Sequence, residues 1–183
     1  MSEDVIINHC SPTLANIKTW NIFSCSYNSR EELTKDIQDL NKKLKPKGLR
    51  VVLLRLTSRA LIYIYRPKML KEDISNEDVS NLLESFGYPT SNIDKCVVNL
   101  CKRISKSSEF PHEIGLFLGY PFDDVKGFIE NKAANFKMNG YWKVYGDENQ
   151  ARKTFLKYER CTSIFTEGLR KGKSIEVLSV KDN

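Results

Sequence analysis

Two short stretches of this sequence hold residues that could carry out acid–base or nucleophilic chemistry. The first is the pair His112 and Glu113, because a histidine titrates near neutral pH and a carboxylate beside it could hold a proton. Neighbouring side chains on a helix point about 100° apart, so this spacing alone does not make a dyad. Leu116 stands where the HExxH zinc motif needs its second histidine, which excludes that motif. His112 and Glu113 are candidate acid–base residues, with a structural role at a helix start as the alternative.

The second stretch is HCSPT, residues 9–13. A cysteine at a turn can become a reactive thiolate when a cation stabilises it, and Lys18 and His9 are close to Cys10 in sequence. With His112 as the base, Cys10 would supply the nucleophile of a thiolate mechanism. The alternative is an ordinary loop cysteine, since no glycine pattern of a known cysteine nucleophile flanks it.

A third stretch, NGYWKVYGD, combines aromatic rings with a cation. If it is a strand, Tyr141, Lys143 and Tyr145 share one face, because side chains alternate along a strand. Trp142 and Val144 then face the core. The first face is expected either to form the floor of a pocket for a planar or anionic ligand or simply to face solvent.

The common motifs of nucleotide-binding proteins and hydrolases, GxGxxG, GxxxxGK[ST] and GxSxG, do not occur in the sequence. The five cysteines include no CxxC pair, so neither a disulfide framework nor a zinc site is indicated, and no metal ligand is assigned. Cys96, Cys101 and Cys161 are expected to be small buried hydrophobic residues. The cofactor stays unknown at this stage.

The net charge is +6, yet the basic residues are spread along the chain rather than gathered in a block. Nucleic acids bind to clustered cations that neutralise neighbouring phosphates, so a nucleic-acid partner is unlikely on this pattern. The sequence contains no apolar run of the roughly 18 residues that a membrane helix needs, and its first residues, MSEDVIINHC, are acidic where a signal peptide is basic. A cytoplasmic location without membrane contact is the resulting prediction.

The elements that would position these residues follow from caps and periodicity. Ser29 and Glu32 form a capping box before a helix that ends at Lys47-Gly48, and residues 49–67 predict a β-hairpin with a turn at 57–59. Helical patterns follow between residues 72 and 135. Asp147 with Gln150 predicts the start of a long last helix, and residues 174–180 predict a final strand. Pro12 predicts a turn in the first segment.

The sequence GYP occurs twice, at residues 87–89 and 119–121, each time after an apolar run and before a polar capping residue. Glycine accepts the left-handed conformation at a helix end, and proline does not continue a helix. Both copies therefore predict helix–turn–helix corners, which leaves His112 and Glu113 as the functionally open part of the second copy.

This order of elements predicts an α+β fold in one domain, residues 1–183. We expect a mainly antiparallel sheet of three to five strands, covered mainly on one side by about five or six helices. The expected subdivisions are a loop, strand and helix at 1–48, the hairpin at 49–67, a helical segment at 72–135, and a strand with the long C-terminal helix at 139–183.

Three segments, HCSPTLANIK, PHEIGLFLGYPFDDVKGF and GYWKVYGDENQARKTF, together resemble an uncharacterised family of small proteins from anaerobic bacteria that is catalogued as a domain of unknown function. Their order and spacing cover nearly the whole chain. The resemblance implies a bacterial protein, and it links the family loosely to redox and iron-handling proteins. The residues to which it points are Cys10, Pro12, Thr13, Lys18, His112, Glu113, Gly115, Gly119, Tyr120, Pro121, Tyr141, Trp142, Lys143 and Tyr145.

Two classes of function are expected from these observations. In the first, the protein is a binding or accessory module for a small anionic or planar ligand or a redox partner protein, and its pocket lies where the first segment, the His112 corner and the strand at 141–145 meet. The candidate ligand residues are Thr13, Lys18, Tyr120, Tyr141, Lys143 and Tyr145. In the second, it is a cysteine-dependent enzyme with Cys10, His112 and Glu113 as catalytic residues. A nucleic-acid-binding regulator is the weakest alternative.

Overall fold

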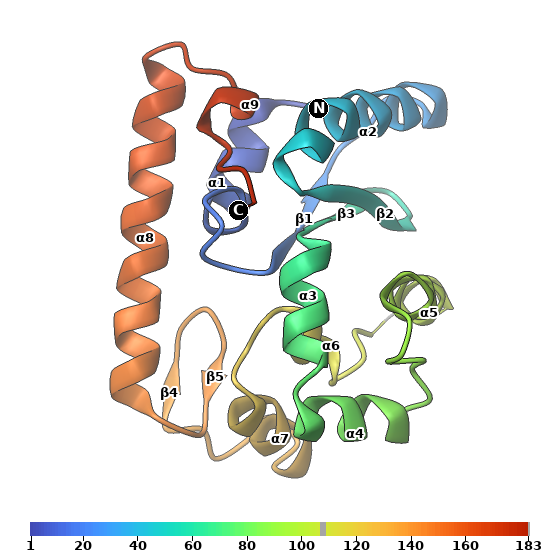
Figure 1. Cartoon of the computed structure of the whole chain (residues 1–183), viewed down its shortest axis with the longest axis vertical. Helices are drawn as coiled ribbons and strands as arrows, with labels where there is room; N and C mark the ends of the chain where they lie inside the picture. Colours follow the sequence, from blue (N-terminus) through green and yellow to red (C-terminus); the bar gives the residue numbers. More distant parts are fainter. Residues whose placement is uncertain (107–108, 183) are drawn as a thin grey trace.

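A computed structural model describes residues 1–106 and 109–182 of the chain (Figure 1). In this part the helices are α1 (Glu3–Leu14), α2 (Arg30–Leu44), α3 (Pro67–Ile74), α4 (Glu77–Ser85), α5 (Ile93–Lys106), α6 (Ile114–Phe117), α7 (Phe122–Glu130), α8 (Glu148–Arg170) and α9 (Ile175–Leu178), with a short 3₁₀ helix at Lys45–Lys47. The strands are β1 (Trp20–Cys25), β2 (Arg50–Leu56), β3 (Ala60–Tyr65), β4 (Met138–Asn139) and β5 (Lys143–Val144). The α+β fold class is confirmed, and the helices that the sequence did not predict are α1, α3 and α9.

The larger sheet has the order β1-β3-β2, and both pairs of strands are antiparallel. The hairpin predicted at 49–67 is confirmed as β2 and β3, with a turn closed by the Thr57 N–H group, which donates to the Arg59 carbonyl over 3.1 Å. The second sheet is the small hairpin of β4 and β5, in which Met138 lies opposite Val144. The strand predicted at 140–146 therefore forms only over the two residues of β5.

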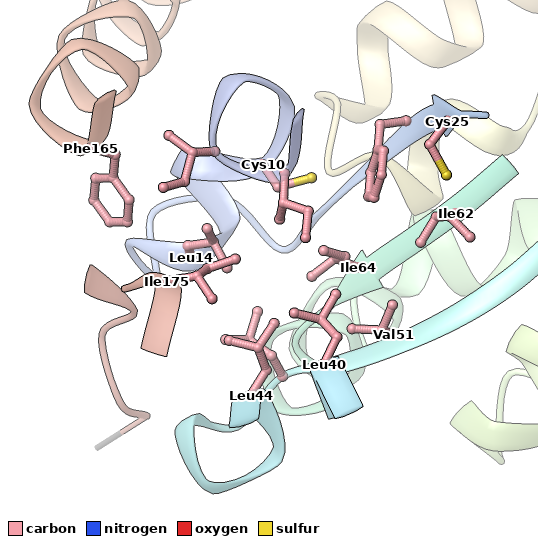
Figure 2. Packing of buried hydrophobic residues seen from close by; sticks show 14 of the residues in the cluster. Cys10, Leu14, Cys25, Leu40, Leu44, Val51, Ile62, Ile64, Phe165 and Ile175 are labelled. Atoms are coloured by element: carbon pink, nitrogen blue, oxygen red, sulfur yellow. The ribbon is translucent and has the colours of Figure 1, made fainter. Parts of the chain in front are cut away.

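Helices cover both faces of the larger sheet, so the expectation of one main covered face is wrong. On β3, Ile62 and Ile64 point into a core formed with α1, α2, α8 and α9, which Figure 2 shows in part. Tyr63 and Tyr65 point into a second core formed with α3 to α7. All four side chains are at most 5% exposed. The continuous apolar run in β3, rather than a strict alternation, is what a strand buried on both faces requires.

Helix α1 passes through Pro12, where the sequence predicted a turn, so that prediction is wrong. Its buried stripe consists of Ile6, Ile7, Cys10 and Leu14. Burial of this stripe favours the helix and offsets the cost of Pro12, which has no N–H group to donate to the carbonyl four residues earlier. The chain then turns where the Pro12 carbonyl accepts the N–H groups of Ile17 and Lys18 over 3.0 and 3.2 Å.

Helix α8 runs along one edge of the molecule and connects its two halves (Figure 1). Its N-terminal part packs on the β4–β5 hairpin, with Ala151 and Tyr158 in a cluster with Trp142. Its C-terminal part packs against α1 through Phe165. The predicted cap is confirmed, because the Asp147 carboxylate accepts the backbone N–H groups of residues 149 and 150 over 2.8 and 3.0 Å.

The strand predicted at 174–180 is wrong, because this segment contains the short helix α9. Ser174 caps it by accepting the N–H group of Val177 over 3.4 Å. Ile175 is fully buried and Leu178 packs against the first core, while Val177 is 66% exposed. The spacing of three between Ile175 and Leu178, rather than the alternation of Ile175 and Val177, sets the buried face.

Both GYP corners have the conformation that the sequence predicted. Gly87 has φ of +79° and Gly119 has φ of +59°, both in the left-handed region, after α4 and α6 respectively. Their tyrosines differ in partners: Tyr88 lies in the second core, and Tyr120 stacks on Trp142 with ring centroids 4.9 Å apart. The second corner therefore brings the segment after His112 against the β4–β5 hairpin.

A fully buried guanidinium, that of Arg66, fastens the C-terminal tail to the rest of the fold. Its hydrogen bonds to the carbonyls of Thr13, Leu14, Lys47 and Val180 are 2.7 to 3.0 Å long. It also pairs with the carboxylate of Asp182. One side chain thus joins the end of α1, the 3₁₀ helix and the tail.

Candidate functional site

A pocket of about 410 Å³ lies between the segment before α6, helix α7 and the β4–β5 hairpin. Its lining residues are 109–112, 114, 115, 120, 124, 125, 128 and 139–143. A volume of this size is in the range of sites for small molecules. The pocket therefore joins the His112 corner to the strand segment whose aromatic residues the sequence singled out.

Aromatic rings form the walls of the pocket. Phe110 is 43% exposed and Tyr141 is 44% exposed, which is unusual for large aromatic side chains. Trp142 and Tyr120 stack on each other behind them, and the Tyr120 hydroxyl donates to the Tyr141 carbonyl over 3.2 Å. Phe128 lines the α7 side. These flat apolar surfaces suit a planar ligand.

Two side chains that can be cationic flank Phe128 inside the pocket. The His112 ring meets the Phe128 ring edge-on, with centroids 5.4 Å apart, and its side chain is exposed. The Lys143 ammonium lies 5.9 Å from the centroid of the same ring. Lys143 and His112 are the basic side chains of the pocket lining, which also includes the carboxylates of Glu109 and Asp124.

The carboxylate of Asp124 lines the pocket and is already fully engaged. Asp124 is 3% exposed and accepts three N–H groups, those of the Trp142 indole at 2.6 Å and of the Tyr145 and Gly146 backbones at 2.7 Å. These bonds fix the β4–β5 hairpin on α7 and so set the width of the pocket. The doubled aspartate at Asp123 and Asp124 is the signal in the sequence that could have pointed to this residue.

The turn between α7 and β4 has a constrained backbone that β5 holds in place. Lys132, Ala133 and Asn135 have φ values of +49°, +63° and +58°, in the left-handed region that residues other than glycine seldom occupy. The Lys143 ammonium donates to the Ala133 carbonyl over 2.7 Å, and the Tyr145 hydroxyl donates to the next carbonyl over 2.9 Å. Tyr145 thus supports the turn and does not line the pocket.

The sequence matches the profile of a family described as "Protein of unknown function (DUF3793)" over residues 6–179. The chain belongs to the DUF3793 family. This confirms the resemblance to a family of unknown function. The comparisons with curated proteins and with solved structures find no match.

The three segments that carried the DUF3793 resemblance have different positions in the fold. The middle and last segments supply most of the pocket wall, including His112, Tyr120, Tyr141 and Lys143. The first segment forms the end of α1 and the turn after it, and none of its described residues lines the pocket. Two of the three segments therefore line the pocket, whereas all three were expected to meet there. The first segment lies outside it.

Glu113 is a buried structural carboxylate in this family member. It is 3% exposed, it accepts the Tyr88 hydroxyl over 3.0 Å, and it pairs with Arg103 at 3.5 Å. The Arg103 guanidinium also lies 4.7 Å from the centre of the Tyr88 ring. Glu113 thereby joins the His112 corner to the first GYP corner. Burial raises the pKa of Tyr88, and the neighbouring Glu113 carboxylate raises it further.

Cys10 lies in a different environment from His112. Its side chain is 0% exposed within the first core, between α1 and the sheet (Figure 2). Burial raises the pKa of this thiol far above its ordinary value, an effect that the charge of Lys18 only partly opposes. Cys10 does not line the pocket to which His112 belongs. The structure therefore offers no thiolate at Cys10 for His112 to activate.

Thr13 and Lys18, the other candidates of the first segment, are buried behind the pocket. The Thr13 hydroxyl donates to the side-chain oxygen of Asn21 over 2.8 Å. The Lys18 ammonium lies 5.5 Å from the ring centres of both Tyr120 and Tyr158. Lys18 thus packs on the far side of a ring that lines the pocket, where it supports Tyr120 rather than meeting a ligand directly.

Substitution of Lys18 by methionine is expected to stabilise the protein at neutral pH. Burial lowers the pKa of Lys18 from 10.5 to about 8. The folded state releases this proton near pH 8 while the unfolded chain keeps it to higher pH, so stability rises with pH across that window. Lys18→Met should raise the free energy of unfolding by roughly 2 kcal/mol at pH 7, with the loss of the contacts to two rings already subtracted. This stabilisation should shrink as the pH rises from about 8 to 10.

Urea unfolding of the wild type and of Lys18→Met at several pH values measures this effect. The difference between the two proteins isolates Lys18 from the tyrosines, since both proteins share them. The exposed Lys153→Met variant is the control and should show no such pH trend. If Lys18→Met stabilises the protein by the same amount at every pH, burial does not lower the pKa of Lys18.

Within residues 1–106 and 109–182, no three His, Cys, Asp or Glu side chains are grouped closely enough to hold a metal ion. Over the same residues, none of the helices combines the length and the apolar character that crossing a bilayer requires. All five cysteines are free. Cys96 and Cys161 are buried in the cores as expected, whereas Cys101 is only partly buried against the second core.

Proposed function

We propose that this DUF3793 protein is a binding module for a small, planar, anionic molecule, and that the pocket beside Phe128 is its site. The observation that supports this most is the pocket itself, about 410 Å³ in volume, with aromatic walls and with His112 and Lys143 on one side. This is the first of the two functions that the sequence suggested, now assigned to a defined set of residues.

The planar shape follows from the walls. Phe110, Tyr141 and Phe128 offer ring surfaces from three different elements, and a flat ligand can stack on or between such rings. Phe110 and Tyr141 are both more than two-fifths exposed. Because a ligand would bury these exposed ring surfaces, its binding gains the free energy of removing apolar area from water.

The negative charge follows from the polar groups. Two carboxylates line the pocket, those of Asp124 and Glu109. The dipoles of three N–H donors partly offset the charge of Asp124, so it opposes an anion less than a carboxylate without such donors would. Lys143 and His112 flank the same ring and supply the cationic partners. A carboxylate or phosphate on the ligand would be placed near Phe128, with the ring system towards Phe110 and Tyr141.

The cysteine-dependent enzyme is less well supported, because Cys10 is fully buried and outside the pocket. A redox or iron-linked accessory role is a narrower form of the binding proposal. It would require that the planar anion be a flavin or a haem, both of which carry anionic groups on or beside a flat ring system.

A thermal-shift screen tests the proposal. Flavin mononucleotide, haem, NAD⁺, ATP and simple aromatic carboxylates are added to the purified chain. At least one compound should raise the melting temperature by about 5–10 °C when its concentration is a hundred times its Kd. The control series consists of uncharged analogues, such as riboflavin for flavin mononucleotide, which should bind at least tenfold more weakly because they lack the anion.

Two exposed apolar residues provide a variant and its control for this screen. Phe110 lines the pocket and is 43% exposed, while Val98 lies outside it on α5 and is 51% exposed. Phe110→Ala should weaken binding of the stabilising compound about tenfold, and Val98→Ala should leave its Kd within twofold. If no compound stabilises the protein, or if both variants bind equally well, the proposed site is wrong.

A further inference from the structure

The outer side of α8 carries a second concave surface, separate from the pocket. A groove of about 520 Å³ lies between this helix and the turn after α1. Leu156 and Ile164 line it and are 54% and 66% exposed, while Cys161 and Phe165 form a buried floor and Ile17 forms the opposite wall. Leu156 and Ile164 are eight residues apart, about 12 Å along a helix. Exposed apolar side chains beside a groove are typical of a docking surface.

Three cations, Lys153, Lys157 and Arg160, also line this groove, and no carboxylate lines it in the described part of the chain. Lys153 and Lys157 are four residues apart, and Lys157 and Arg160 are three apart, so like charges are neighbours on the helix surface. This arrangement slightly destabilises the isolated helix. Elsewhere on the same helix, Arg152 is paired with Glu148 at 3.9 Å.

We propose that this groove binds an amphipathic helix of a partner protein whose apolar side carries leucine-like residues and whose flanks are acidic. The apolar residues would occupy the space between Leu156, Ile164 and Ile17, as side chains of helices do in other groove-binding pairs. The acidic residues would pair with Lys153, Lys157 and Arg160. Charge complementarity assigns the partner's sign, because the rim of the groove carries three cations and no described acid.

The shape of the surface favours a protein helix over the other possible occupants. A bilayer surface is flat and would meet only the rim of a concave groove, whereas the side chains of a helix can enter it. A second copy of this chain would need an acidic apolar helix of its own. The acidic helix α4 does not serve, because its apolar residues Val79, Leu82 and Leu83 already pack in or against the second core.

Site-specific photo-crosslinking in the native host tests this proposal. The probe is p-benzoylphenylalanine, placed at Leu156 in the full-length chain, and crosslinked peptides are identified by mass spectrometry. The control position is Arg152, which is exposed and outside the groove. We expect a protein crosslink from position 156 and not from 152, mapped to a segment that has helical apolar spacing and net negative charge.

The identified partner is then purified and titrated against charge-reversal variants. Lys157→Glu and Arg160→Glu should each weaken binding of the partner at least tenfold. Lys157→Gln should weaken it by a smaller factor, and Arg152→Glu should change the Kd less than twofold. All three residues are exposed, so the four variants should stay folded by circular dichroism, and Arg152→Glu should lose only its exposed ion pair with Glu148. Binding should also weaken as the salt concentration rises.

Several results would overturn the proposal. These are no crosslink from position 156, a crosslink to a second copy of this chain or to a phospholipid, and a partner segment without acidic residues. Equal weakening by Arg152→Glu and Lys157→Glu would do the same. Because the groove and the pocket share no lining residue, failure here leaves the ligand proposal for the pocket intact.

Discussion

Asp124→Asn is expected to destabilise the protein by about 3 kcal/mol and to abolish binding in the pocket. The wild-type carboxylate accepts three N–H groups, two on Oδ1 and the Trp142 indole on Oδ2. An asparagine can keep one acceptor oxygen, but its NH₂ group then faces an N–H donor at one of these positions. The site is 3% exposed, so solvent does not replace the lost bonds. Urea unfolding followed by tryptophan fluorescence measures the loss.

Asp123→Asn is the matched control for this prediction. Asp123 is the preceding residue in the same first turn of α7, it loses the same charge, and its side chain is exposed. Its substitution should change stability by less than about 0.5 kcal/mol. Equal effects of the two variants would mean that charge at the start of α7, rather than the three hydrogen bonds, holds the hairpin.

Arg66→Met is expected to cost about 3–5 kcal/mol of stability and to release the C-terminal tail. The variant removes a fully buried cation that satisfies four backbone carbonyls and the Asp182 carboxylate. Methionine fills part of the volume but donates no hydrogen bond, so the Val180 carbonyl loses its guanidinium donor and the Asp182 carboxylate loses its cation. Equilibrium unfolding gives the loss, and limited proteolysis should cut the tail of the variant much faster than that of the wild type.

Arg59→Met provides the comparison for an exposed arginine. Arg59 also makes two hydrogen bonds, both to Ser24, but it lies in the solvent-exposed turn of the β2–β3 hairpin. Its loss should cost less than about 1 kcal/mol, because water replaces its partners. A tail that stays resistant to protease in Arg66→Met would show that Arg66 does not fasten it.

The elements that local signals specify were predicted well. Ser29 and Asp147 cap α2 and α8 as expected, and Gly87 and Gly119 have the left-handed conformation that ends a helix. The hairpin of β2 and β3 also lies within its predicted range. Capping and turn residues act through atoms a few positions away, so a sequence window contains the whole interaction.

The elements that depend on distant packing were missed. The helix through Pro12 forms because its stripe is buried against the sheet and α8, and a local rule for proline gives no weight to that burial. At the C-terminus, Ile175 and Val177 alternate like strand residues, but contact with α1 and α8 makes the segment a helix. Cover on both sheet faces likewise depends on where α1 and α5 lie.

The candidate site was predicted in part. His112, Tyr120, Tyr141 and Lys143 all line the pocket, as their aromatic and basic character suggested. The predicted alternation of strand faces is wrong, because β5 is only two residues long, Trp142 lines the pocket and Tyr145 does not. Cys10 was assigned a role from its neighbours in sequence, which do not reveal that its side chain is 0% exposed. Asp124 was missed because its three donors follow it by about twenty residues, a separation that no local pattern spans.

The most direct test of the ligand site uses the two tryptophan indoles as internal reporters in a ¹H–¹⁵N correlation spectrum. Trp142 lines the pocket and its indole N–H group donates to Asp124, whereas Trp20 is 0% exposed in the second core and does not line the pocket. A titration with the planar anion that stabilises the protein most should shift the Trp142 indole signal saturably and leave the Trp20 signal in place. A saturable shift of Trp20 alone, or no shift of Trp142 at a concentration that stabilises the protein, would contradict the proposed site.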